Sequence, residues 1–595
     1  MTNNFLPTSI KEMAARGWDQ ADIILVTGDA YIDHPAFGVA LIGRWLEAHG
    51  FKVAILAQPR HHNIDDFKQF GPPRLFYGIT AGNLDSIVAN YSGNKKVRDQ
   101  DAYSPQGNPY FGEQKEKKFR RRPDRASILY TNLAKNAYPQ TPVVLGGIEA
   151  SLRRFVHYDY QQAKIRNSIL TDAKADLLVY GMGEKAVLEI ARRLQSGAPI
   201  QAIAGTCERL TDNAYHDRQL GSSALILPTH QNIVKDAALF LKSELLLDEH
   251  ARSLSETPVL QRQKTNWLLQ NQPATPLTVV ELDRLYSLPF CRAPHPSAKD
   301  VPAYRMIRHS ATIVRGCSGN CSFCAITRHQ GPRVISRTPS SILKEIELIS
   351  RMADFKGTIS DLGGPTANLY GTSCRITGCK KQDCFYPKLC KNLQINEEVM
   401  IDLLQKSSKV KGVKHVFVSS GLRMELLLKT PRLLKELILH HTPGAMKIAP
   451  EHTEKEVLRL MHKPGSMMLS EFLNYCRKIA TDSNHEIHFN PYVISAHPGC
   501  TAAEMRNMAR KLKELGITAR QPQDFTPTPG TISTAMYVSG LDRETGQQIH
   551  VPKNSSERQE QRHTLMEKTT QDKRPHFAPT DPPGTKRRKT KKTTK

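Results

Sequence analysis

Little in this chain would anchor it in a membrane or hold it together outside a cell. No apolar run reaches the roughly 18 residues that a membrane-spanning helix needs. Cysteine is sparse, at 11 of 595 residues, and its clustering favours reduced, metal-binding thiols over a disulfide framework. The N-terminal residues also lack the basic and apolar regions of a secretory signal. These absences exclude membrane-spanning and disulfide-rich secreted proteins, and they predict a cytoplasmic location.

Acidic residues are outnumbered, because 57 Asp and Glu face 83 Lys and Arg and leave a net charge of +26. Such a surplus makes nucleic acid a candidate partner, and the simpler interpretation is a basic soluble protein without one. A polar insertion at 94–125 mixes basic with aromatic side chains and is either a phosphate- and base-binding surface or a solvated loop. Its residues of interest are Lys115, Lys117, Lys118, Arg120, Arg121 and Arg122, with Tyr103, Tyr110, Phe111 and Phe119.

The length of the chain is too great for one hydrophobic core, so we expect several domains. Residues 1–205 alternate short apolar runs with helical patterns, which predicts an α/β fold with an N-terminal doubly wound parallel sheet. Residues 206–300 read as an irregular or helical linker. The strand–helix alternation returns over 301–540 in six units, which predicts a partial parallel (βα)6 barrel. Residues 541–595 read as a basic, disordered tail.

The most informative motif is a run of three cysteines, Cys317, Cys321 and Cys324, spaced as C-x3-C-x2-C. Three thiolates can hold three irons of a 4Fe–4S cluster. Because such clusters normally have four thiolate ligands, the fourth iron would be open to an outside ligand. The alternatives are three structural thiols or a zinc knuckle without its fourth ligand. Zinc sites more often use paired C-x2-C units, so the cluster is favoured.

This spacing resembles the signature of radical S-adenosylmethionine (SAM) enzymes. The resemblance implies that SAM binds the open iron and that one electron, from a donor such as flavodoxin or ferredoxin, cleaves it to a 5′-deoxyadenosyl radical. Phe323 would then lie near the adenine. Gly363 and Gly364 match the glycine-rich motif that contacts the amino group of SAM. Pro365 replaces the usual acidic residue there, so the contact would use backbone carbonyls.

Longer motifs bring a closer resemblance into view, to the uncharacterised YgiQ family of radical SAM proteins. The similarity covers roughly residues 15–540 and implies one 4Fe–4S cluster on three cysteines with exchangeable SAM, but no known reaction. It is carried by DAYIDHP at 29–35, GGIEAS at 146–151, RGC at 315–317, APEH at 449–452 and DFTPTPG at 524–530.

The N-terminal domain also looks like the cobalamin-binding domain that precedes some radical SAM barrels, which makes cobalamin a candidate cofactor. The D-x-H-x-x-G motif of base-off cobalamin binders is absent, and the nearest stretch is DHPAFG at 33–38. Many barrel-linked cobalamin domains lack that histidine too. The sequence therefore leaves cobalamin binding open.

A second cysteine group lies in an insertion at 370–392, with the spacing C-x4-C-x4-C-x5-C. Four thiolates could close a second cluster or a zinc site. The alternative is a set of thiols that merely lie near one another in a folded lid. The group consists of Cys374, Cys379, Cys384 and Cys390.

Together these features predict a radical SAM enzyme that abstracts hydrogen from an unknown substrate. One alternative is a methylthiotransferase or methyltransferase acting on RNA or protein. The first 200 residues contain no cysteine, whereas the N-terminal domain of methylthiotransferases usually carries three. An alternative of another class is a non-catalytic iron–sulfur or zinc protein that binds nucleic acid.

Overall fold

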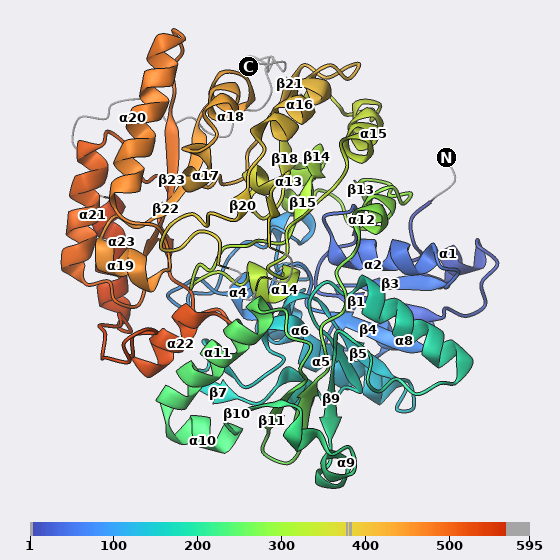
Figure 1. Ribbon diagram of the computed structural model, residues 1–595. Coiled ribbons are helices and arrows are strands. Elements are labelled where there is room, and N and C mark those ends of the chain that lie inside the picture. The colour runs from blue at the N-terminus through green and yellow to red at the C-terminus, as the bar shows by residue number, and fades with distance from the viewer. Residues whose placement is uncertain (1–3, 377–378, 380–382, 567–595) are drawn as a thin grey trace, which may run out of the picture.

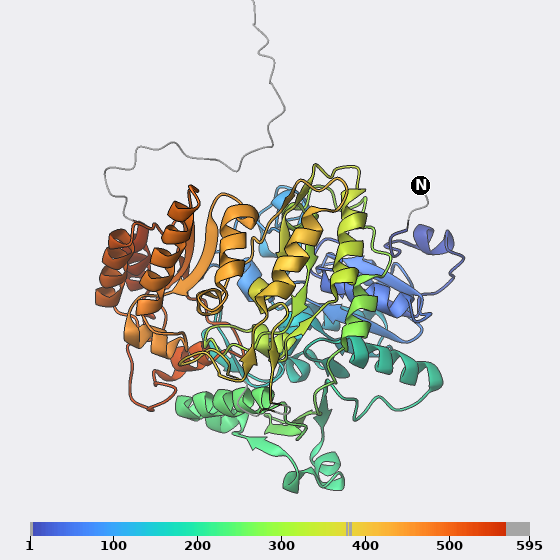
Figure 2. The ribbon, with the colours of Figure 1, turned by 45° about the horizontal axis from the view of Figure 1, so that its top comes forward.

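A computed structural model describes residues 4–376, 379 and 383–566. The N-terminal half of the chain, blue to green, forms one large sheet with its helices, and the later part, yellow to orange, forms a barrel that lies against it (Figure 1). Figure 2 shows the same two parts side by side from a second direction. The two parts meet along the edge where the functional residues lie.

The N-terminal sheet has nine strands in the order β10-β11-β12-β9-β8-β5-β4-β1-β3. Five of them are parallel and lie in the spatial order β3-β1-β4-β5-β8, so the first strand in the chain lies between the second and the third. This is the flavodoxin-like doubly wound order, whose switch point lies between β1 and β4. The predicted fold class is confirmed. The five strands are β1 (Ile23–Thr27), β3 (Val53–Ala57), β4 (Phe76–Thr80), β5 (Val143–Leu145) and β8 (Leu177–Val179).

Helices cover both faces of this sheet, which is why its strands are continuous apolar runs. Ile23 and Leu25 of β1 share one buried cluster with α2 (Gly38–Glu47) and α8 (Glu184–Ser196). On the other face the alternate strand residues pack with α5 (Ala126–Ala137) and α7 (Ile169–Ala173).

The region predicted as an irregular or helical linker, 206–300, instead extends the sheet. β9 pairs antiparallel with β8 and β12, and β11 pairs antiparallel with β12 and parallel with β10. These strands are short, and buried glutamines that bond to distant groups interrupt their apolar pattern. The bounds are β9 (Thr206–Leu210), β10 (Leu225–Leu227), β11 (Val259–Arg262) and β12 (Trp267–Gln270), with α10 (His230–Lys235), α11 (Ala237–Arg252) and α12 (Val279–Tyr286).

The barrel is built from strands that pair in parallel along an open arc. β14 pairs with β18, and β17 pairs with β21. Leu422 forms a single parallel bridge with Ile448 of β22, β22 pairs with β23, and β23 pairs with β24. β17 and β18 are two segments of one strand. The strands are β14 (Ser310–Thr312), β17 (Thr358–Ile359), β18 (Asp361–Gly363), β21 (His415–Val416), β22 (Met446–Glu451), β23 (Phe489–Ser495) and β24 (Gln523–Asp524).

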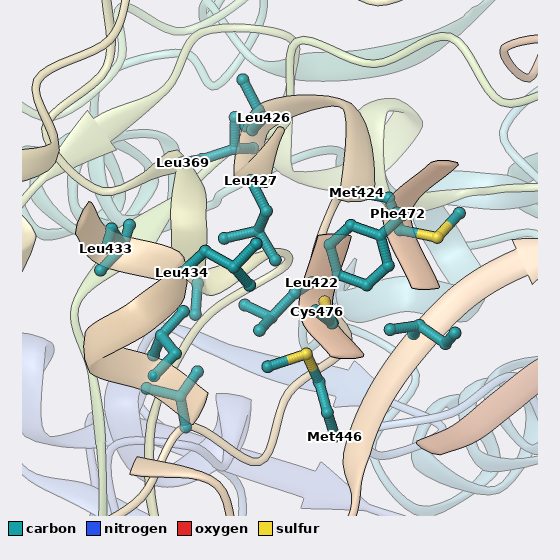
Figure 3. Close-up of a cluster of buried hydrophobic side chains, with 14 of the residues drawn as sticks. Leu369, Leu422, Met424, Leu426, Leu427, Leu433, Leu434, Met446, Phe472 and Cys476 are labelled. Carbon is teal, nitrogen blue, oxygen red and sulfur yellow. The ribbon is translucent and has the colours of Figure 1, made fainter. Parts of the chain in front are cut away.

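Helices wrap the outside of this arc and enclose a core of leucines and methionines (Figure 3). Phe472 and Cys476 enter this core from α20, and Met446 enters it from β22. The helices are α15 (Pro339–Ser350), α16 (Glu397–Ser408), α17 (Met424–Leu427), α18 (Pro431–Glu436), α19 (Lys455–Leu460), α20 (Met467–Asp482) and α21 (Ala502–Glu514). Helix α22 (Ile532–Ser539) packs on α11 instead.

The tail predicted as disordered from residue 541 begins with ordered structure. Helix α23 (Ser555–Met566) packs on α21 and against β23 and β24. Two of its buried side chains, Arg558 and Gln561, are polar and bond to main-chain groups. Because these buried positions are polar, the sequence of α23 lacks the apolar periodicity that would have predicted a packed helix. Residues 567–595 lie outside the described part of the chain.

The basic insertion at 94–125 is in part a structural element. Arg120 and Arg122 are buried, and Arg122 forms ion pairs with Asp29 and Asp101. These arginines are therefore not available to phosphates. Within the described residues, no helix combines the length and the apolar character needed to cross a membrane.

Candidate functional site

The three cysteines lie on a loop between two short antiparallel strands, and we call residues 316–325 the cysteine loop. It leaves β15 (Val314–Arg315), continues into α14 (Ile326–Gln330) and returns to the sheet through β16 (Ile335–Ser336). Gly316 has φ +80°, and a Cβ atom there would lie 1.9 Å from the carbonyl oxygen of Arg333. Only glycine fits this turn, which directs the chain towards the barrel.

The three thiols are neighbours in a largely covered site. Burial raises the pKa of Cys324 to about 12, and the charges of Cys321 and Cys317 add to the shift. Cys317 is buried, whereas Cys321 and Cys324 are half-buried. Among the described residues no three His, Cys, Asp or Glu side chains converge on one point, as a single metal ion would require. A 4Fe–4S cluster places each thiolate on a different iron, so this spread is compatible with a cluster.

Arg423 is a functional candidate that the spacing of motifs in the sequence does not reveal. Its Nη2 donates to the Cys321 sulfur at 3.6 Å, and its guanidinium stacks 4.0 Å from the Phe385 ring centroid. Glu425 accepts a hydrogen bond from the same guanidinium. A buried cation thus lies against a thiol of the loop, where it can compensate negative charge.

C-terminal elements hold the middle of the loop through Ser322. The Ser322 backbone N–H donates to the carbonyl of Met461 at 3.0 Å, and the Ser322 carbonyl accepts from the Ser533 N–H at 2.8 Å. Arg543 Nη1 also donates to the Ser322 hydroxyl at 2.8 Å. The loop is therefore positioned from α19 and α22 as well as from its own strands.

Phe323 packs against a small buried cluster formed by Tyr160, Phe525 and Tyr537. Its ring lies edge-on to His497, with the centroids 6.5 Å apart. Burial lowers the pKa of His497 to about 3, so the ring is neutral. Its Nδ1–H donates to the Pro498 carbonyl at 2.8 Å, and its Nε2 accepts from the Ser533 hydroxyl at 2.7 Å.

A cavity of about 560 Å³ lies between the carboxyl ends of the sheet strands and the mouth of the barrel. Thr27, Thr80 and Gly146 line it from the sheet, and Gly363 and Gly364 line it from the barrel. The side chains of the cysteine loop do not line it, although the flanking Arg315 and Gln330 do. A Cβ atom on Gly364 would lie 2.6 Å from the carbonyl of Val314, so the two barrel strands approach closely beside the loop.

A buried ion pair joins the two halves of the molecule at this cavity. Arg315 Nη1 lies 2.7 Å from Glu184 Oε1 at the start of α8, and Arg315 Nε donates to the Tyr286 hydroxyl at 3.2 Å. The second carboxylate oxygen of Glu184 is buried and has no hydrogen-bond partner among the described residues. Because Arg315 stands two positions before Cys317, this pair connects the cavity with the cysteine loop.

His34, the histidine of the 33–38 stretch, does not face the cavity. Its side chain is buried, and its Nδ1 accepts from the Ala36 N–H at 3.1 Å. Burial and the neighbouring Arg292 hold its pKa well below the usual range.

The second cysteine group lies beside the first. The Cys384 N–H donates to the Ser318 carbonyl of the cysteine loop at 3.2 Å. Burial raises the pKa of Cys384 to about 11. Cys374 is exposed, and Cys379 and Cys390 are half-buried.

Comparisons with known proteins agree with this architecture. The model described as "Radical SAM N-terminal" matches residues 5–310, and the "Radical SAM superfamily" model matches 312–512. UPF0313 protein GSU2873 of Geobacter sulfurreducens is 45% identical over 571 residues, covering 95% of this chain and 92% of that protein. A UPF0313 protein of Thermotoga neapolitana is 45% identical over 572 residues, covering 94% and 98%.

Among solved structures, the chain shares its fold with the radical SAM methyltransferase TsrM from Kitasatospora setae, solved with cobalamin and a [4Fe-4S] cluster bound. The TM-score is 0.50 at 14% sequence identity, and the match covers 89% of this chain and 87% of that one. The expected resemblance to the YgiQ family is confirmed by the curated relatives. The chain belongs to the UPF0313 (YgiQ) family, and it is a radical SAM enzyme that uses a 4Fe–4S cluster and SAM.

Proposed function

We propose that Cys317, Cys321 and Cys324 hold the 4Fe–4S cluster at which SAM is reductively cleaved, and that a substrate beside the cavity loses a hydrogen atom to the resulting radical. The observation that carries this proposal is the convergence of Arg315, at the start of the cysteine loop, with Gly363 and Gly364 on one cavity. The bound cluster supplies the single electron that SAM cleavage needs.

In this proposal, the residues of this chain bind SAM and orient it. The backbone at Gly363 and Gly364 would lie beside the amino group of SAM, and Phe323 would pack near the adenine. Because the buried Gly363 carbonyl already accepts from the Ile313 N–H at 2.8 Å, the Gly364 carbonyl is the better placed acceptor. Asp361 does not replace the missing acidic residue, since its carboxylate already accepts from the backbone N–H groups of Ser419 and Ser420 at 2.8 and 3.2 Å. It fixes the adjoining loop instead.

Product analysis of one variant tests this assignment. Anaerobic protein supplied with dithionite and SAM should form 5′-deoxyadenosine, and Cys321→Ala should lose both the cluster iron and this product. Cys291→Ala, a matched change at a half-buried cysteine outside the loop, should keep both. A Cys321→Ala protein that retains full iron and product formation would show that the ligands are elsewhere.

A second candidate function is methyl transfer with cobalamin in the cavity. The cavity lies at the switch point of a doubly wound sheet, where such sheets bind their ligands. Glu184 lines it, and the Glu184 oxygen that has no hydrogen-bond partner within the described part of the chain could accept from an amide side chain of a corrin ring. Since His34 faces away, no ligand to the cobalt would come from residues 33–38.

Titration of the anaerobic protein with hydroxocobalamin tests this second function. We expect a visible absorbance change that saturates at one cobalamin per chain. An unchanged spectrum, with the corrinoid recovered free after gel filtration, would contradict cobalamin binding and would leave the SAM cleavage proposal intact.

A further inference from the structure

We propose that the end of the barrel opposite the cavity binds single-stranded nucleic acid through a basic surface, which the ends of α15 and α16 and the loops after them form. Two segments make up this surface, 347–356 and 402–414, and they carry six Lys or Arg against three Asp or Glu. The proposal is independent of SAM cleavage, since none of the six lines the cavity. The basic residues are Arg351, Lys356, Lys406, Lys409, Lys411 and Lys414.

The fold brings the two segments together. Helices α15 and α16 lie side by side (Figure 1), and the loops after them lead into β17 and β21, which pair in parallel. The Lys414 and His415 N–H groups both donate to the Gly357 carbonyl, at 2.7 and 3.0 Å. A hollow of about 870 Å³ lies between the helix ends, so several cations share one space. Its charged lining residues are Glu347, Arg351, Lys406, Lys409 and Lys411.

Most of this positive charge is not neutralised by the described residues. Lys406 pairs with Asp402 at 2.7 Å, and Asp354 pairs at 3.1 Å with Arg308, which lies outside the two segments. The other five basic residues of the surface are exposed and form no ion pair within the described part of the chain. Glu347 is the one acid left to oppose them.

The needs of the helix ends explain only part of this charge. Arg351 and Lys409 are the C-caps of α15 and α16, where a cation compensates the partial negative charge of a helix end. Lys356, Lys411 and Lys414 lie beyond those ends, in the loops. Such a concentration of cations holds counterions, and a polyanion gains free energy by releasing them when it binds.

A flat ring beside these cations favours nucleic acid over an acidic protein as the partner. The exposed imidazole of His415 follows Lys414 and lies parallel to the Phe417 ring, with the centroids 5.8 Å apart. Aromatic rings in a basic groove stack with unpaired bases, while neighbouring cations bind the backbone phosphates. Because stacking needs unpaired bases, the ligand is a single strand.

Fluorescence anisotropy of a labelled single-stranded RNA, about 16 nucleotides long, tests the proposal on the full chain. We expect a dissociation constant of about 1–100 µM that rises steeply with salt. The triple variant Lys409→Gln/Lys411→Gln/Lys414→Gln should bind about tenfold or more weakly. The slope of log affinity against log salt should fall by about 2, because each of three lost phosphate contacts contributes about 0.7 on a single strand.

The matched control, Lys11→Gln/Lys52→Gln/Lys174→Gln, removes the same charge from exposed positions in the N-terminal half. It should keep the affinity and the salt slope of the wild type. Both variants should form 5′-deoxyadenosine as the wild type does, since the surface lies about 20 Å along the strand from Gly363.

Two results would overturn the proposal. Equal weakening in the two triple variants would mean that only the overall charge of the chain attracts RNA. A wild-type protein that binds no RNA would also overturn it, and if an acidic protein such as flavodoxin then binds to the wild type but not to the first triple variant, the surface serves a protein instead.

Discussion

Arg423 places a buried positive charge against Cys321, at a hydrogen-bond distance of 3.6 Å. Hydrogen bonds and positive charge near the sulfurs favour the reduced, more negative state of an iron–sulfur cluster. Arg423→Met should therefore lower the reduction potential of the cluster. Each tenfold shift of the one-electron equilibrium towards the oxidised state corresponds to a decrease of about 59 mV. A redox titration followed by electron paramagnetic resonance measures this.

The matched control for that change is Arg423→Lys, which keeps the charge and loses the planar fork. It should give a smaller shift than Arg423→Met. Equal potentials in the wild type and Arg423→Met would show that Arg423 acts only in packing against Phe385.

His497 predicts a dependence of stability on pH. Burial lowers its pKa from the ordinary 6.5 to about 3, so the unfolded chain binds a proton that the folded chain does not. Its contribution to stability is present above about pH 6.5 and is lost as the pH falls towards 3. Between pH 7 and 5 the loss is about 2 kcal/mol.

Urea unfolding of the wild type and of His497→Gln at both pH values checks this. The glutamine cannot titrate, so the variant should be less stable at pH 7 but should lose less stability on acidification. Parallel losses in the two proteins would place the acid sensitivity on other groups.

At the scale of single residues, spacing in the sequence predicts Cys317, Cys321 and Cys324 as ligands, because local spacing alone carries that signal. Arg423 and Ser533 could not be found this way. Each reaches the cysteine loop from a position more than one hundred residues later in the chain, and nothing in its neighbouring sequence marks the contact.

Among the elements, the turn that starts the cysteine loop depends on Gly316. Gly316→Ala would combine a strained φ of +80° with a clash against the Arg333 carbonyl. We expect a cost of about 1–3 kcal/mol and a lower iron content after reconstitution. Thermal unfolding and iron analysis measure both effects.

Gly331, at the other end of the same hairpin, provides the matched control. It also has a positive φ, of +83°, but a Cβ atom there would meet nothing within 4 Å. Gly331→Ala should cost about 1–3 kcal/mol, because φ +83° with ψ 167° is a backbone region that essentially only glycine adopts, but without the clash it should lower the iron content less than Gly316→Ala does. Equal iron loss in both variants would contradict a specific role for the Gly316 turn.

Local signals explain which elements the sequence could predict. Thr338 and Pro339 begin α15 as N-cap and first-turn proline, a helix start that can be recognised from these two residues in the sequence. Strands β11 and β12 were missed because Gln261 and Gln270 break their apolar pattern. These glutamines are satisfied by Val156 and Arg154, more than one hundred residues earlier, so only the folded chain explains their burial.

For the whole molecule, Arg558 connects the N-terminal part with the barrel. Its guanidinium donates to the carbonyls of Gly93 and Phe525 and to the Asn94 side chain. Arg558→Ala would remove the guanidinium from the Phe525 carbonyl and the Asn94 side chain, while the Gly93 carbonyl would still accept from the Tyr160 hydroxyl, and it should cost about 3–5 kcal/mol. Urea unfolding followed by intrinsic fluorescence measures the loss.

Arg562, one turn later on α23, is the control. It is more exposed and pairs with Asp524 at 3.3 Å, so Arg562→Ala should cost less than about 1 kcal/mol. Similar losses in the two variants would mean that α23 contributes by packing alone.

The two halves of the fold were predictable separately, since each has its own strand–helix rhythm. The way in which the two halves contact each other could not be predicted. Glu184 and Arg315 belong to different halves, and neither is marked in the sequence as the partner of the other, yet their ion pair joins the cavity to the cysteine loop.

The central claim is that Cys317, Cys321 and Cys324 support reductive cleavage of SAM. The most direct measurement is a single-turnover assay, in which the reconstituted anaerobic chain is reduced with dithionite and mixed with SAM. We expect 5′-deoxyadenosine from the wild type and none from the variant in which all three cysteines are alanine. A reduced wild-type protein that holds its iron and binds SAM, but forms no 5′-deoxyadenosine, would contradict it.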